Sequence, residues 1–139
     1  DLHPESLVAA DASLAGVVIL APSKAGAGDA AQAFRDGALD DAAERMAARF
    51  GAAPIRIDDA GALAAIAADA GIETIVTPYA PVGPIADHLA AAASTLQNAG
   101  VALRRMRRSW DDAAWPHADR GFFKLKEKIP AILREVGLT

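Results

Sequence analysis

Two different periods of apolar and polar positions alternate along the chain, and the switches between them predict the secondary structure. Three segments space aliphatic side chains three or four residues apart, as one face of a helix requires. They are residues 39–50, 62–70 and 84–99. Each is followed by a glycine, Gly51, Gly71 or Gly100, and glycine favours the left-handed conformation in which helices commonly end. The sequence therefore predicts three amphipathic helices.

Short segments rich in β-branched residues precede or follow these helices. They are residues 15–22, 54–58, 72–79 and 101–106. The first, AGVVILAP, is a near-continuous apolar run and is expected to be a strand buried on both faces. Strands that alternate with helices of this length favour a parallel sheet with right-handed crossovers. We expect a doubly wound α/β sandwich of Rossmann-like type over residues 15–139, preceded by an extension or linker at residues 1–14.

Composition narrows the class of protein. The 139 residues suffice for one domain, and 53% of them are hydrophobic although only 5% are aromatic. The absence of cysteine excludes disulfides and thiolate metal sites. No apolar run approaches the roughly 20 residues that span a bilayer, and the acidic start lacks the basic region of a signal peptide. We therefore expect a cytoplasmic protein without membrane association and, because it starts at Asp1 rather than methionine, a fragment of a longer chain.

Charge is distributed unevenly along the chain. Residues 1–103 hold 5 basic and 13 acidic side chains, whereas residues 104–139 hold 9 basic and 5 acidic ones. Such a division can mark a surface that meets an anionic ligand, nucleic acid or an acidic partner domain. The alternative is an ordinary solvated face of a carboxyl-terminal helix.

Ligands of doubly wound sheets bind beyond the carboxyl ends of the strands. Three predicted loops at such ends are therefore candidate ligand-binding sites. They are residues 21–29, 58–61 and 77–84. In the first loop Lys24 could reach an anion, but its G-x-G lacks the third glycine of a dinucleotide fingerprint, so a flexible connection is the alternative. In the third, Tyr79 follows the strand in a loop stiffened by three prolines, and the alternative is a ring packed on the next helix.

The segment SWDDAAWPHADRGFFKLKEKIP, residues 109–130, gathers both tryptophans with basic side chains. Arg107 and Arg108 could bind a phosphate backbone while Trp110 or Trp115 stacks on a base or flat chromophore. Alternatively, residues 101–108 form a strand whose long arginine side chains lie along the edge of a sheet. In the same way, residues 122–133 could dock through Phe122 and Phe123 as anchors and keep their lysines solvated.

No catalytic constellation can be assembled from the sequence. His117 is the only histidine flanked by other polar and aromatic candidates, and a metal site needs more ligands than its neighbourhood supplies. A nucleophile–base pair would need a partner such as Ser109, and closeness in sequence does not establish contact. The sequence predicts no catalytic or metal-binding residues.

The order of elements and the carboxyl-terminal segment resemble the α/β domain of the DNA photolyase/cryptochrome family, over Ala15 to Leu138. Residues 33–58 are similar to that family's helix followed by a strand, and residues 70–84 to the strand that ends in its proline-rich loop. Residues 100–130 are similar to the segment that leads from that family's α/β domain to its interdomain linker. The family's opening strand, with its arginine–aspartate–leucine–arginine sequence, and its FAD-binding helical domain are absent from this sequence.

The resemblance implies an accessory domain that is not catalytic alone. Its parent would be a DNA-binding lyase that repairs pyrimidine dimers with light, or a blue-light sensor, with FAD held outside this chain by a helical domain of the same polypeptide. An antenna pigment of folate or deazaflavin type is implied at the strand-end loops. The implied cofactor-binding residues are Ser23, Lys24, Tyr79, Pro81 and Gly83. The implied interdomain or nucleic-acid contacts are Arg107, Arg108, Trp110, Trp115, His117, Arg120 and Lys124.

Two other classes remain open. A free-standing nucleotide-binding module of universal-stress or electron-transfer-flavoprotein type shares the layered sheet, although the glycine-rich phosphate loop after a late strand is missing here. A structural interaction domain without a ligand is the third hypothesis, and fold-level analogy alone does not separate these classes.

Overall fold

The computed structural model describes residues 3–9, 12–22, 28–119 and 121–138. The chain divides into two compact units, Asp1–Arg105 and Met106–Thr139, where the sequence predicted one domain. They are called unit 1 and unit 2 below. Each unit is described by itself.

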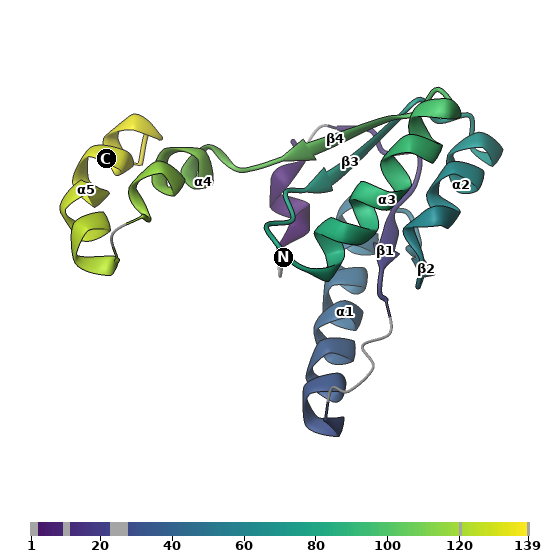
Figure 1. Cartoon of the computed structure of the whole chain (residues 1–139), viewed down its shortest axis with the longest axis horizontal. Coiled ribbons are helices and arrows are strands. Elements are labelled where there is room, and N and C mark those ends of the chain that lie inside the picture. The colour runs from purple at the N-terminus through teal and green to yellow at the C-terminus, as the bar shows by residue number, and fades with distance from the viewer. Residues whose placement is uncertain (1–2, 10–11, 23–27, 120, 139) are drawn as a thin grey trace. The chain divides into compact units, whose positions relative to one another are not determined.

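The strands of unit 1 form two separate parallel pairs (Figure 1). β1 (Val18–Leu20) pairs with β2 (Ile55–Ile57), and β3 (Thr74–Pro78) pairs with β4 (Ala102–Met106). The mixed α/β class is confirmed, and each strand lies within the segment predicted for it. Among the described residues, however, the strands do not join into the single doubly wound sheet that the sequence predicted.

Three α-helices connect these strands: α1 (Asp29–Phe50), α2 (Leu63–Asp69) and α3 (Pro84–Asn98). Two short 3₁₀ helices accompany them, η1 (Pro4–Leu7) and η2 (Ala60–Ala62). The glycine predictions are confirmed at all three ends, and Gly51 caps α1 with φ of 68°. The beginning of α1 differs, because it starts at Asp29 and its alanine-rich first half lacks the apolar spacing from which the helix was predicted to begin at residue 39.

The helices lie on opposite faces of the β1–β2 pair. Ile57 of β2 and its register partner Leu20 of β1 pack against the core formed with α2 and α3. Arg56 points to the other face, because successive side chains alternate along a strand, and it forms an ion pair with Asp40 of α1. Helices on both faces are the arrangement that doubly wound folds share.

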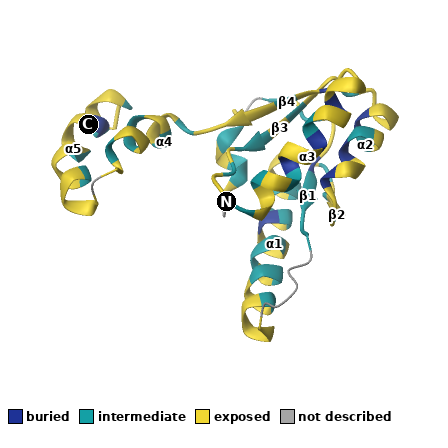
Figure 2. Cartoon of the chain, viewed as in Figure 1, coloured by how far each residue is buried: buried dark blue, intermediate teal, exposed yellow. Residues whose placement is uncertain are grey.

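The core of unit 1 is small and aliphatic (Figure 2). Its buried members come from η2, α2, α3 and the start of β4's segment: Ala60, Leu63, Ala67, Leu89, Ala92, Leu96 and Val101. The prediction that β1 is buried on both faces is wrong, since all three of its residues are only half-buried. A strand pair exposes more surface than the continuous sheet for which an apolar run is suited.

Unit 2 consists of α4 (Ser109–Ala114), the 3₁₀ helix η3 (Trp115–His117) and α5 (Phe122–Glu135). α4 and η3 both contact α5, and among the described residues of this unit Ile132 of α5 is the buried side chain, 2% exposed. The prediction that Phe122 and Phe123 anchor the segment is wrong within this chain, because they are 64% and 79% exposed. Their rings contact each other edge to face instead, with centroids 5.8 Å apart.

Candidate functional site

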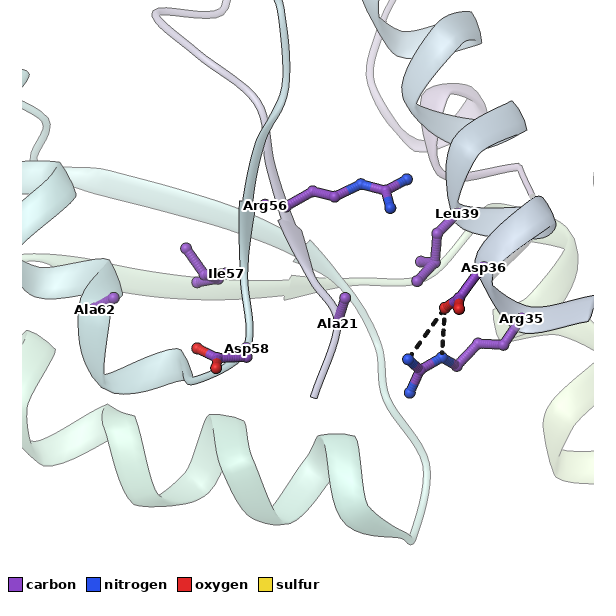
Figure 3. Close-up of a pocket in the computed structure, with 8 residues that line it drawn as sticks. All are labelled: Ala21, Arg35, Asp36, Leu39, Arg56, Ile57, Asp58 and Ala62. Carbon is purple, nitrogen blue, oxygen red and sulfur yellow. Dashed lines mark hydrogen bonds and ion pairs between the residues drawn. The ribbon is translucent and has the colours of Figure 1, made fainter. Parts of the chain in front are cut away.

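An open groove of about 510 Å³ lies at the carboxyl ends of β1 and β2 in unit 1 (Figure 3). Ala21 directly follows β1 and Asp58 directly follows β2, while α1 forms the opposite wall. This is the edge at which parallel α/β sheets bind ligands. The lining residues are Ala21, Arg35, Asp36, Leu39, Arg56, Ile57, Asp58 and Ala62.

Two guanidinium groups enter the groove from opposite walls. Figure 3 shows Arg35 extending from α1 toward Ala21, and Arg56 extending from β2 toward α1. Arg35 Nη1 donates to the Pro22 carbonyl at 2.6 Å and its Nη2 donates to Asp36 at 3.1 Å. Arg56 binds the exposed carboxylate of Asp40. Arg35 is therefore held by a backbone carbonyl and a carboxylate, whereas Arg56 makes an exposed ion pair that a ligand can replace.

Carboxylates balance these cations. Arg35, and after it the Gln32 amide, hold the pKa of Asp36 below its ordinary value by hydrogen bonding. Asp36 is thus an ionised acceptor at neutral pH. Asp58 is exposed and makes no hydrogen bond or ion pair with another described residue. Its carboxylate is the group of the groove with free capacity to accept hydrogen bonds from a ligand's hydroxyl or amide groups.

Apolar side chains supply the remainder of the lining, with Leu39 from α1 and Ile57 from β2 as the largest. A ligand with a flat or aliphatic body and an anionic group would match this surface, since guanidinium groups bind carboxylates and phosphates in a planar, two-point geometry. The groove falls within the roughly 300–1,000 Å³ that small-molecule sites occupy.

The predicted cofactor-binding residues lie in two loops. Ser23 and Lys24 lie outside the described residues, and they follow Pro22, the residue whose carbonyl Arg35 binds. Tyr79, Pro81 and Gly83 lie in the loop from β3 to α3 and are not among the residues that line the groove.

Gly83 has a structural role that the sequence analysis did not assign to it. It precedes α3 with φ of 132° and ψ of −178°, a region of backbone conformation that is essentially restricted to glycine. Its carbonyl accepts the Asp87 N–H at 3.1 Å, which closes the first turn of α3. The proline-rich loop therefore fixes how α3 leaves β3.

The predicted contact residues gather in unit 2. Arg107 lies over the Trp115 ring, 5.9 Å from its centroid, and forms an ion pair with Asp112 at 2.6 Å. Asp111 accepts the backbone N–H of Arg108 at 3.3 Å, which caps α4. Trp110 and Trp115 are 37% and 49% exposed. Lys124 is exposed at the start of α5, His117 is half-buried in η3, and Arg120 lies outside the described residues.

Sequence reasoning missed the α1 wall of the groove. Asp58 stands in a loop that was named as a candidate, but Arg35 and Arg56 were not singled out. The available indication was the pair Arg35–Asp36 one helical turn before Leu39, on a helix that follows the first strand. The apolar spacing predicted the helix only from residue 39, so it gave the pair no place on a helix.

Neither a metal centre nor a membrane span is found in the part of the chain that the structure describes. No group of three or more histidine or carboxylate side chains is placed there to hold a metal ion. None of its helices has the length and apolar character that crossing a membrane demands.

Comparison with protein-family models, with curated proteins and with solved structures finds no match to this chain.

Proposed function

We propose that this chain is the accessory α/β part of a flavoprotein of the photolyase/cryptochrome type. Unit 1 would hold a small chromophore in the groove at the carboxyl ends of β1 and β2. Unit 2 would contact the FAD-binding helical domain of the same polypeptide. The parent protein would perform light-driven DNA repair or blue-light sensing, and the strands of unit 1 would belong to one doubly wound sheet in it.

The groove is the observation that carries this proposal. Its position at the strand ends agrees with the general rule for ligand sites in parallel sheets, and its lining suits a pigment of folate or deazaflavin type. Arg35 and Arg56 would bind the anionic tail of such a pigment, Leu39 and Ile57 would contact its flat ring, and Asp58 would accept hydrogen bonds from its polar edge. The bound pigment would absorb light and pass excitation energy to the flavin.

Unit 2 supports the docking role. Its exposed tryptophan and phenylalanine rings, together with Arg107, form the combination of aromatic side chains and arginine that is enriched in binding surfaces. This chain would catalyse no reaction of its own. Its residues would bind and orient the pigment and hold the helical domain.

The decisive experiment is pigment binding followed by fluorescence and visible absorption. The chain is titrated with a folate-type and a deazaflavin-type pigment, and the parent protein is purified in the dark and scanned for flavin bands. We expect the chain to bind one of the pigments, and Arg56→Gln to weaken that binding about tenfold or more, as expected for loss of a charge-assisted contact. Arg104→Gln, on β4 and outside the groove lining, is the matched control. A parent protein without flavin would overturn the assignment.

A nucleotide-binding module is the second candidate, and Asp58 is the observation that favours it. A carboxylate at the end of the second strand of a βαβ unit is the group that binds ribose hydroxyls in dinucleotide-binding folds. Titration of the same chain with ADP, ATP and NAD distinguishes the candidates. Binding of a nucleotide that Asp58→Asn weakens, with no binding of either pigment, would favour the module.

A further inference from the structure

The two cations that enter the groove are already paired with carboxylates of one helix. Asp36 and Asp40 stand four residues apart on α1, so their side chains lie on the same side of that helix. Asp36 accepts a hydrogen bond from Arg35, and Asp40 accepts one from Arg56. Among the described residues of the groove, an anionic ligand therefore meets no unpaired guanidinium group, and it has to displace one of these two carboxylates.

The Arg35–Asp36 pair is held by further contacts on both sides. Arg35 donates to the Pro22 carbonyl at 2.6 Å, and it also donates to Asp36 through Nε at 3.3 Å and Nη2 at 3.1 Å. Asp36 accepts in addition from the Gln32 amide at 3.2 Å. Several hydrogen bonds to charged groups would have to break together before a ligand could replace Asp36. This pair is therefore a fixed part of the groove wall.

The Arg56–Asp40 pair is held by much less. Among the described residues, Asp40 is the hydrogen-bond partner of Arg56, and its Oδ1 accepts from Nη2. The side chains of Arg56 and Asp40 are 43% and 65% exposed. Exposed ion pairs of this kind contribute little to stability, whereas a guanidinium group has five N–H donors and binds an oxyanion through two of them at once. Asp40 is therefore a weak ligand of Arg56 that an oxyanion can replace.

The charges of the groove also oppose an anion through Asp40. The lining contains two cations, Arg35 and Arg56, and two carboxylates, Asp36 and Asp58, so these four charges balance. Asp40 adds a negative charge beside Arg56, where an anionic ligand would bind. An incoming oxyanion thus competes with Asp40 for Arg56 and is repelled by the carboxylate that it displaces.

We propose that Asp40 determines which ligands the groove accepts, by acting as an internal competitor for Arg56. The ligand class is an oxyanion, a carboxylate or a phosphate, whose two oxygens bind Arg56 together while its apolar body lies against Leu39 and Ile57. Anions that bind through a single point, such as chloride, do not displace Asp40. The inference rests on the groove being the ligand site of the proposed function, but it does not require a ligand that absorbs light.

The test measures the binding of two small oxyanions to the full chain and to its variants. Benzoate supplies a carboxylate, phenyl phosphate supplies a phosphate, and both carry a flat ring. Titrations are followed by the amide resonances of Ile57 and Asp58 in ¹⁵N NMR spectra, at about 0.15 M sodium chloride, where exposed charges more than about 8 Å apart are largely screened.

Asp40→Asn should raise the affinity for at least one probe about two- to fivefold, a gain set by the strength of an exposed ion pair. Arg56→Gln should abolish the resonance shifts. Asp41→Asn is the matched control and should leave the affinity unchanged. Asp41 is the next residue of α1, it is 67% exposed, and it pairs with Arg45 instead of Arg56. The probe that binds more tightly identifies the oxyanion that the groove takes.

An equal gain in Asp41→Asn, an unchanged or lower affinity of Asp40→Asn for both probes, or no binding by any of these chains would each overturn the proposal. The result is separable from that of the proposed function. A chain that binds a probe with this dependence on Asp40 and Arg56, but binds neither pigment, would keep this inference and lose the proposed function. Pigment binding that Asp40→Asn leaves unchanged would overturn this inference alone.

Discussion

Unit 1 and unit 2 handle their apolar side chains differently. Unit 1 buries small aliphatic residues, and its largest fully buried side chain is Leu96. Unit 2 contains both tryptophans of the chain and an adjacent pair of phenylalanines, and leaves all four rings substantially exposed around one buried residue, Ile132. Apolar groups that a unit does not bury on folding add nothing to its stability. Unit 1 therefore has a core of its own, whereas unit 2 leaves most of its aromatic surface exposed.

Size sharpens the contrast. Unit 2 spans residues 106–139, which is shorter than the roughly 40 residues below which domains usually need disulfides, metals or association. The chain has no cysteine. The two units should therefore unfold separately, with unit 2 unfolding first, and the placement of both tryptophans in unit 2 allows fluorescence to follow it alone.

The largest effect is expected from Leu96→Ala. Leu96 is 1% exposed in the core of unit 1, and truncating a buried leucine costs about 2–5 kcal/mol. Urea unfolding followed by far-UV circular dichroism should show this loss in the main transition, while the tryptophan fluorescence transition stays in place. A shift of both transitions by the same amount would show that the units unfold as one.

Ile132→Ala is the counterpart in unit 2. A unit of this size supports a total stability of roughly 2–5 kcal/mol on a per-residue scale. Truncating a buried isoleucine costs about 2–5 kcal/mol as well, so unit 2 should be largely unfolded in this variant. Tryptophan emission should shift to the red at zero urea, whereas the main dichroism transition keeps its midpoint. An unchanged emission spectrum would mean that Ile132 is not what holds α5 on α4.

Two glycines with positive φ offer a smaller, matched test. Gly83 in unit 1 has φ of 132° and Gly137 in unit 2 has φ of 73°. Alanine at either position introduces strain of about 1–3 kcal/mol. Gly83→Ala should lower the dichroism midpoint alone, and Gly137→Ala the fluorescence midpoint alone. Gly16→Ala, which has no positive φ and no atom within 4 Å of its added Cβ, should change neither.

The smallest effect is a pH dependence confined to unit 1. Because the pKa of Asp36 is lowered in the folded state, its contribution is present above the unfolded pKa, near 3.8, and is lost as pH falls through the lower folded value. Urea midpoints by dichroism, measured from about pH 5 to pH 2, should fall less steeply in Asp36→Asn than in the unaltered chain. Equal slopes would show that the Arg35 contact does not persist in solution.

The helices and strands of unit 1 were largely predictable because local patterns determine them. The glycine after each helix is a local signal, and it is confirmed. So is the apolar face formed by Leu89, Ala92 and Leu96, which are buried, whereas Ile85, predicted on the same face, is 41% exposed. The pairing of β1 with β2, and the absence of pairing between β1 and β3, depend on groups far apart in sequence. No local pattern carries that information.

The groove and unit 2 show what local patterns leave out. Asp58 stood in a predicted strand-end loop, but Arg35 reaches the groove only because α1 extends back to Asp29 through residues that lack apolar spacing. Phe122 and Phe123 looked like anchors because aromatic side chains are usually buried. Ile132, one of several aliphatic residues in α5, is buried instead, in a unit where α4 and η3 contact α5.

The arrangement of the two strand pairs also bears on the order of folding. β1, α1 and β2 are contiguous in sequence, and so are β3, α3 and β4, so each pair closes a local loop and can form on the ribosome as soon as its own segment has emerged. The contacts between the pairs are non-local and form later. Pulse-labelled hydrogen exchange during refolding should show Ile57 and Arg104 becoming protected within their own pairs independently of one another. A chain that folds in this way acquires its two strand pairs as separate intermediates, each with open backbone edges at which a strand of another molecule can pair.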